Sequence, residues 1–261
     1  VGGILYEHGH RLVASGVGLL TVVLATWLWL REPRRWVKRL GLVALGAVIA
    51  QGALGGLTVL FFLPPAVSTA HAGLAELFFC TVVSLALFTS RSWLDGEDAV
   101  DDGVLRRVAT TTSALIYTQI LIGATMRHTD AGLAIPDFPW MFGHVFPDHW
   151  SPQIAVHFAH RVGALVVSLA VLATAGHILF HHRARPRLVR PALLILALLV
   201  TQVTLGALTV LTRRDVWINS VHLVCGALVF ATSIVITLRT WRVRFARPMS
   251  ATDAGRAQAH A

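Results

Sequence analysis

Long apolar runs separated by short polar segments are the dominant pattern along this chain. A helix needs about 20 apolar residues to cross a bilayer. Seven runs reach that length, at 5–30, 40–63, 67–89, 108–126, 153–180, 191–211 and 217–240. Within lipid, a helix satisfies its backbone hydrogen bonds internally. The pattern therefore predicts an all-α integral membrane protein with seven visible transmembrane helices.

The second half of the chain repeats the first. Segment 51–59 (QGALGGLTV) aligns with segment 202–210 (QVTLGALTV) at an offset of 151 residues. The same offset carries His71 onto His222. One offset shared by separate features predicts two tandem, pseudo-symmetric four-helix half-bundles.

The repeat divides the chain into four parts: 1–94, an acidic cytoplasmic linker at 95–107, 108–244, and a polar tail at 245–261. In the second half, the run 108–126 precedes the first histidine-bearing helix, and the first half shows no counterpart to it. Either the halves are unequal, or the natural protein has an eighth helix before Val1. We favour the eighth helix, because the chain begins without Met and directly at a histidine motif.

Positive charge is concentrated on one side of these helices. Of the 22 Lys and Arg residues, 17 fall within 31–39, 91–107, 183–190 and 239–256. Cytoplasmic segments of membrane proteins are enriched in such residues, so these segments and the C-terminus are placed in the cytoplasm and the N-terminus outside. The chain is 55% hydrophobic and only 13% charged. Its net charge of +9 therefore reports a multi-pass topology in the cell membrane and does not indicate nucleic-acid binding.

Four histidines are predicted to share a depth near the outer ends of four helices: His10, His71, His160 and His222. An imidazole inside a membrane needs water, a hydrogen bond or a metal ion. A six-coordinate heme takes two imidazoles from separate helices. Each half offers one such pair. A single membrane histidine is more often a hydrogen-bonded interfacial group, but four at repeat-related positions favour ligation of two hemes toward the outer face.

A carboxylate distinguishes the first histidine pair from the second. Glu7 lies one helical turn before His10 on the same face, whereas His157 holds that place before His160. A carboxylate beside a heme can accept a proton or stabilise developing positive charge. A salt bridge between Glu7 and Arg11 is the alternative.

Arginines on the outer side suit the propionates of a heme, because a guanidinium binds carboxylates with paired donors. Arg11 and Arg161 directly follow histidines, and Arg127 directly follows the fourth run on the same side. Anchoring at the membrane interface is the alternative for each. Three glutamines each stand four positions before a pair of small residues, which we interpret as helix packing: Gln51, Gln119 and Gln202.

These motifs together resemble the heme A synthase family. The resemblance rests on Glu7-x-x-His10-Arg11, the loop 129–139 (TDAGLAIPDFP), His160-Arg161, and the lone His71 and His222. It covers nearly the whole chain. It implies eight helices in two four-helix halves, a heme b cofactor in the C-terminal half and heme O as the substrate in the N-terminal half. The implied reaction oxidises the C8 methyl of heme O to the formyl group of heme A.

The resemblance also assigns roles to single residues. His160 and His222 match the ligands of the cofactor heme, His10 and His71 those of the substrate heme, and Glu7 the family's essential acid. Ile135 stands where many members carry a cysteine, so the thiol is absent there. The implied partners are heme O, heme O synthase and an electron donor in the membrane, with a homo-oligomer as one option.

A diheme transmembrane b-type cytochrome that only transfers electrons is the main rival function. Four histidines serve an enzyme and an electron carrier equally well. Glu7 favours the enzyme, because an electron carrier has no need for a carboxylate at one heme only. A transporter with histidine proton sites would explain the repeat, but not the shared depth of the histidines.

Overall fold

In the computed structural model, the chain folds into long helices. The structure describes residues 2–61, 64–94 and 100–245, with the backbone alone at 2–7 and 244–245. In chain order, the elements are α1 (Gly2–Arg31), α2 (Arg35–Leu60), α3 (Pro65–Thr89), α4 (Arg91–Leu94), α5 (Gly103–His128), the 3₁₀ turn η1 (Ala131–Leu133), α6 (Pro152–His181), α7 (Pro186–Leu211) and α8 (Val216–Phe245). The predicted all-α membrane fold is confirmed.

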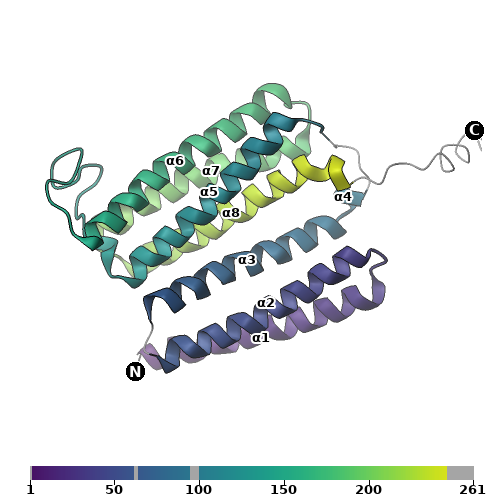
Figure 1. Ribbon diagram of the computed structural model, residues 1–261, viewed down its shortest axis with the longest axis horizontal. Helices are drawn as coiled ribbons and strands as arrows, with labels where there is room; N and C mark the ends of the chain where they lie inside the picture. Colours follow the sequence, from purple (N-terminus) through teal and green to yellow (C-terminus); the bar gives the residue numbers. More distant parts are fainter. Residues whose placement is uncertain (1, 62–63, 95–99, 246–261) are drawn as a thin grey trace, which may run out of the picture.

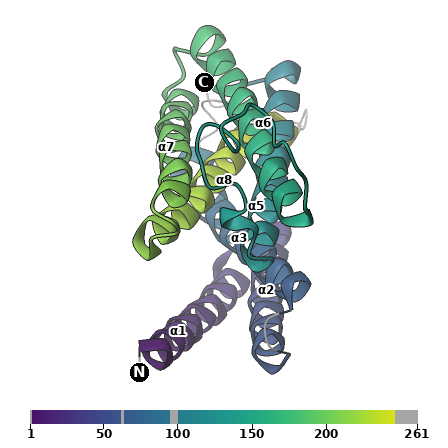
Figure 2. The same ribbon diagram turned by 90° about the vertical axis from the view of Figure 1, so that its left-hand side faces the viewer.

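The long helices run side by side in two groups (Figures 1 and 2). In the C-terminal group, α5, α6, α7 and α8 form a closed bundle in which each helix packs on two others. In the N-terminal group, α2 packs on both α1 and α3. The groups are joined by α3, which packs on α5 and α8. Within the described residues, three long helices thus stand in the first group and four in the second.

The predicted boundaries of the parts remain a prediction. Part of the predicted linker 95–107 belongs to α5, which begins at Gly103. Linker residues 95–99 and nearly all of the tail, from 246 onward, lie outside the described residues.

Six of the described helices are long and apolar enough to span a membrane, where seven spans were expected. The exception is α5, which contains the predicted run 108–126. It is as long as α2, at 26 residues, but its composition is more polar. The fold nevertheless surrounds α5 with apolar helices, since it packs on α3, α6 and α8.

Two buried polar residues of α5, Thr112 and Ser113, bond to neighbouring helices and contribute to its weak apolar signal. The hydroxyl oxygens of Thr112 and Thr174 lie 2.8 Å apart, joining α5 to α6. Ser113 donates to Ser233 at 3.1 Å and lies 2.9 Å from the hydroxyl of Thr237, joining α5 to α8. Interhelical hydrogen bonds of this kind hold membrane helices together where lipid offers no hydrophobic driving force.

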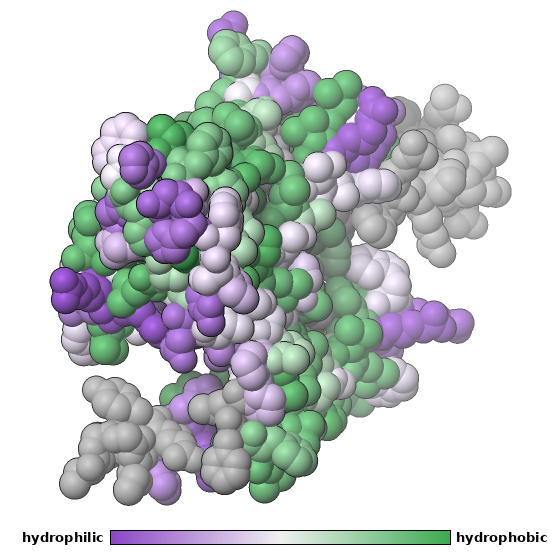
Figure 3. Space-filling view, turned by 60° about the vertical axis from the view of Figure 1, so that its left-hand side comes forward, coloured by the Kyte–Doolittle hydropathy of each residue, from purple (hydrophilic) through white to green (hydrophobic). Residues whose placement is uncertain are grey.

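The larger core lies in the C-terminal bundle, around residues such as Leu105, Val171, Ile195 and Ile236. The buried cluster between α1, α2 and α3 is smaller. Large apolar side chains of α1 and α2 stay exposed, as expected of helices that face lipid. Figure 3 shows apolar side chains over much of the exposed helix flanks and hydrophilic side chains gathered in patches.

The alternating directions of the helices bring the four histidines to one end of the molecule. The helices α1, α3, α6 and α8 all begin at the end that carries the N-terminus and the loop 129–151, called here the histidine end (Figure 1). The segments 32–34, 90–94, 100–102 and 182–185 lie at the opposite, arginine end, together with the end of α8. Proline at the first position starts α3, α6 and α7, where its missing N–H costs nothing.

Candidate functional site

His160 lies in a cradle that α5 provides. The side-chain Nε2 of Gln119 lies 3.0 Å from Nδ1 of His160 and donates to the backbone oxygen of the same residue at 2.7 Å. One turn further along α5 is Gly123. A Cβ at that position would lie only 2.8 Å from Cε1 of His160, so the imidazole can rest against α5 only because this residue is glycine.

His222 is held in the same way by α7. Nε2 of Gln202 lies 3.3 Å from Nε2 of His222. A Cβ at Gly206, four positions after Gln202, would lie 3.2 Å from Cε1 of the imidazole. The two histidines of the C-terminal bundle therefore each receive a glutamine and a glycine from a neighbouring helix.

The N-terminal group repeats the arrangement at His71. Nε2 of Gln51 lies 3.3 Å from Nε2 of His71 and donates to its backbone oxygen at 3.0 Å. A Cβ at Gly55 would lie 3.2 Å from Cε1 of His71. The repeat that aligns the two halves in the sequence thus also aligns their hydrogen bonds.

The two histidines of each predicted pair are near enough to interact electrostatically, and His71 is also near His128. One pair is His160 with His222, and the other is His10 with His71. His10 differs from the other three because it is exposed on α1.

The histidines fit the ligation of iron. Nδ1 of His71 and Nδ1 of His222 are buried and have no hydrogen-bond partner among the described residues, nor has the Oε1 atom of any of the three glutamines. An unpaired buried polar atom costs about 1–3 kcal/mol. A metal-bound histidine uses one nitrogen for the metal and has the other oriented by a hydrogen bond. Among the described residues, the Gln202 amide bonds only to the ring of His222, so its rotation would present Oε1 to an imidazole N–H and leave the other ring nitrogen for a metal. The amides of Gln51 and Gln119 are held as they stand, because each also donates to the backbone oxygen of its histidine.

The glutamines are candidate functional residues whose role the sequence interpretation missed. Their spacing to glycine was taken as helix packing alone, yet each one touches a candidate ligand. A signal was present in the sequence. Gln51 stands 20 residues before His71, and Gln202 stands 20 residues before His222.

His157 and Arg161 fasten the loop 129–151 to α6. The His157 side chain is 2% exposed, and its Nδ1 lies 3.1 Å from the backbone oxygen of Ala131. Nε of Arg161 donates to Nε2 of His157 at 3.1 Å. The backbone N–H of Ile135 also lies 3.3 Å from Nδ1, so His157 contacts the loop at both Ala131 and Ile135. The imidazole of His157 therefore holds the loop against α6. The residue at the equivalent position of the first half, Glu7, carries a carboxylate instead.

The guanidinium of Arg161 also binds backbone oxygens further along the loop. It donates to Trp140 at 2.9 Å, to Ile135 at 3.1 Å and to Asp137 at 2.6 Å. Of the five N–H donors of an arginine, these bonds and the bond to His157 use four. One donor remains for a propionate, and the predicted heme contact of Arg161 stays a prediction. Its observed contacts fix the loop beside the start of α6.

Asp137 shapes the tip of the same loop. Its carboxylate accepts the backbone N–H groups of Phe142 and Gly143, each at 2.8 Å. Desolvation raises the pKa of Asp137, but the hydrogen bonds from Gly143 and Phe142 outweigh it and hold the pKa below its usual value. The carboxylate is therefore ionised at neutral pH and keeps the tip folded back on itself.

The other predicted site residues also lie at the histidine end. Glu7 belongs to α1 by its backbone, and its side chain lies outside the described residues. Arg11 is exposed in the next turn of α1, and Arg127 is exposed in the last turn of α5. Their predicted contacts with heme propionates remain predictions.

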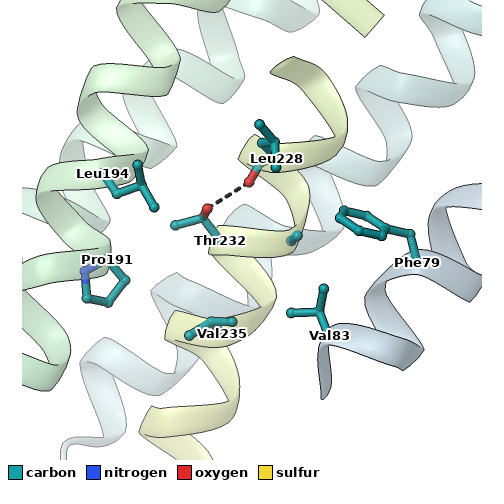
Figure 4. Close-up of a pocket in the computed structure, with 8 residues that line it drawn as sticks. Phe79, Val83, Pro191, Leu194, Leu228, Thr232 and Val235 are labelled. Carbon is teal, nitrogen blue, oxygen red and sulfur yellow. Dashed lines mark hydrogen bonds between the residues drawn. The ribbon is translucent and has the colours of Figure 1, made fainter. Parts of the chain in front are cut away.

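An apolar groove lies away from the histidines, between α3, α7 and α8 (Figure 4). Its volume is about 250 Å³, and its walls include Phe79, Leu194 and Leu228. The hydroxyl of Thr232 in this groove already donates to the backbone oxygen of Leu228, at 2.7 Å. The groove therefore offers apolar surface and no candidate iron ligand, and the paired histidines remain the candidate site.

Comparison with known proteins gives one consistent result. Residues 3–234 match the model of a family described as cytochrome oxidase assembly protein, COX15-CtaA. A heme A synthase of Shouchella clausii is 32% identical over 213 residues, covering 79% of this chain and 69% of that protein. Heme A synthases of Halalkalibacterium halodurans and Geobacillus kaustophilus are 29% and 27% identical, over 90% and 96% of this chain and 79% of each relative.

Proposed function

Because the chain belongs to the COX15-CtaA family, the family of the heme A synthases, we propose that it oxidises the C8 methyl of heme O to the formyl group of heme A. It is a membrane oxidoreductase of heme A biosynthesis. The proposal assigns heme O to the N-terminal group, between His10 and His71. It assigns a heme b cofactor to the C-terminal bundle, between His160 and His222.

The observation that carries this proposal is the repeated cradle of the histidines. Three of the four candidate ligands meet a glutamine amide and a glycine from the adjacent helix. Any buried imidazole needs a polar partner, but the same pair of glutamine and glycine at three candidate ligands supports a role that they share. Partners that orient an imidazole are typical of metal ligands, and they set the tautomer and the direction of the free nitrogen.

We assign a separate role in this reaction to each of several residues. A heme bound by His160 and His222 supplies one-electron redox chemistry. Gln119 and Gln202 orient these imidazoles, and Arg161 holds the loop 129–151 over the start of α6. In the N-terminal group, Gln51 orients His71, and the carboxylate of Glu7 stabilises positive charge that develops near the substrate's methyl group.

Production of heme A tests the proposal. Cells that make heme O but have no other heme A synthase would be given this protein, and their extracted pigments would be identified by mass. We expect heme A only when the protein and heme O are both present. Heme b bound to the purified protein without any heme A in the cells would instead support the diheme electron carrier.

Replacing Gln202 tests the proposed orientation of His222. Second-shell partners typically contribute 10–100-fold to metal affinity. We therefore expect Gln202→Ala to weaken retention of the cofactor heme by about tenfold or more and to shift its reduction potential, both measured on purified protein. Thr201→Ala is the matched control, because Thr201 is exposed on the same helix and bonds only within it, to Ala197. Equal behaviour of the two variants would show that Gln202 serves packing alone.

The charge asymmetry predicts the orientation of the chain in the membrane. A reporter enzyme that is active only outside the cytoplasm should be silent when fused after Ala261. The same reporter inserted beside Val145, which is exposed in the loop 129–151, should be active. The opposite pattern would reverse the proposed orientation and place the histidine end in the cytoplasm.

A further inference from the structure

Three metal-binding side chains converge at the arginine end, far from the histidine pairs. They are Asp102, the residue that caps α5, and His177 and His182, at the end of α6. Oδ2 of Asp102 lies 2.7 Å from Nε2 of His177 and 2.9 Å from Nε2 of His182. All three atoms lie within 4.8 Å of one another. The residues are 75 and 80 positions apart in the chain, so the fold, rather than local sequence, assembles the cluster.

We propose that Asp102, His177 and His182 form a binding site for a divalent cation of the zinc class. Zinc takes imidazole and carboxylate ligands at about 2.0–2.2 Å, which separates tetrahedral ligands by roughly 3.3 Å. The observed O–N distances are shorter by about half an ångström, so small side-chain rotations make room for the ion. The side chains are 20%, 20% and 14% exposed, which leaves a fourth coordination position open to water.

The carboxylate of Asp102 is divided between two tasks. Oδ1 accepts the backbone N–H groups of Val104 and Leu105, both at 2.9 Å, and so caps α5. Oδ2 is left for the imidazoles. Burial alone would raise the pKa of Asp102, but the bonds from Leu105, His177 and His182 together lower it well below its usual range. The group is therefore an anion whenever the histidines are neutral enough to bind a metal.

The surroundings select the kind of cation. Basic residues are concentrated at this end of the molecule, among them Arg106 and Arg183. Arg106 forms an ion pair with Asp101, at 3.3 Å. A hard ion such as Mg²⁺ prefers oxygen ligands, and this cluster offers a single carboxylate. Zinc and neighbouring transition metals bind imidazole nitrogen directly, and two imidazoles are present.

A bound ion would join two elements that the chain separates. It would tie the cap of α5, which lies within the predicted linker, to the last turn of α6. His181 is a nearby imidazole that stands outside the triad. Its ring stacks on His177 with centroids 4.4 Å apart, and its Nδ1 lies 3.1 Å from the backbone oxygen of His177. It therefore serves as an internal control.

Zinc titration of the heme-loaded protein tests the site. Purified protein at pH 7.5 would compete with a chromophoric chelator for Zn²⁺, with Mg²⁺ as the comparison ion. We expect one zinc ion per chain in the wild type and in His181→Ala. His177→Ala and His182→Ala should lose that ion. Asp102→Asn should keep the helix cap, because asparagine also caps helices, and bind zinc at least about tenfold more weakly.

Acidification and heme spectra complete the test. Zinc should dissociate on acidification, because protonated imidazoles cannot bind the ion. The heme spectrum should be the same in all variants, which shows that each is folded. The proposal would be overturned if the wild type bound no zinc, or if His177→Ala and His182→Ala bound zinc as tightly as the wild type. Loss of zinc binding in His181→Ala would also overturn it.

Discussion

Replacing either His160 or His222 with alanine should remove the low-spin spectrum of the cofactor heme. A bis-imidazole iron needs both ligands, and the structure shows that each of these imidazoles is held by its own glutamine and glycine. Loss of one ligand leaves a five-coordinate or water-ligated iron, which absorbs differently. The optical spectrum of the purified protein, with heme quantified per chain, measures the effect.

Two controls separate loss of ligation from loss of folding. His181→Ala removes an imidazole at the other end of α6 and should leave the spectrum unchanged. His222→Gly supplemented with free imidazole should regain the low-spin spectrum, because the small ligand can fill the space of the missing ring. An unaltered spectrum in both His160→Ala and His222→Ala would refute the assignment of these residues to the cofactor heme.

Glu7→Gln should nearly abolish production of heme A while leaving both hemes bound. The change keeps the shape of the side chain and removes its negative charge. Oxidation of a ring methyl develops positive charge, which a fixed carboxylate stabilises. Loss of one preorganised electrostatic group costs about 3 kcal/mol of barrier, or about a hundredfold in rate. The measurement is the ratio of heme A to heme O extracted from the variant.

Glu32→Gln is the matched control for Glu7. Glu32 follows α1 at its other end and pairs with Arg34 at 2.6 Å. The substitution Glu32→Gln removes the same negative charge far from the histidine pairs, so heme A production should stay near the wild-type level. A normal rate in Glu7→Gln would instead make Glu7 an interfacial partner of Arg11, and the electron-carrier function would become the better account.

The membrane fold could be predicted because hydropathy is a local property of the chain. The run 67–89 lies within α3 (Pro65–Thr89), and the run 217–240 lies within α8 (Val216–Phe245). The run 108–126 also lies within α5, but its apolar signal is weaker, because Thr112 and Ser113 lower its hydropathy while their hydroxyls bond to α6 and α8. Polar groups that are satisfied by neighbouring helices thus weaken the apolar pattern of a helix in the bundle.

The repeat predicts the histidine pairs and relates Gln51 to Gln202, whereas other contacts of the site could not be predicted from it. The offset of 151 residues relates His71 to His222 without any knowledge of the fold. The role of Gln119 depends on α5 lying against α6, which is a tertiary contact between residues 41 positions apart. The same holds for Arg161, whose donors reach loop oxygens more than 20 residues away. The cluster of Asp102 with His177 and His182 has no sequence pattern at all.

The central claim is that each half of the molecule holds its own heme, the substrate in the first and the cofactor in the second. His71→Ala tests it most directly, in cells that supply heme O, with hemes extracted from the purified protein and identified by mass. The account predicts that this variant keeps heme b and contains neither heme O nor heme A. Loss of heme b, or retention of heme O and heme A at wild-type levels, would contradict it.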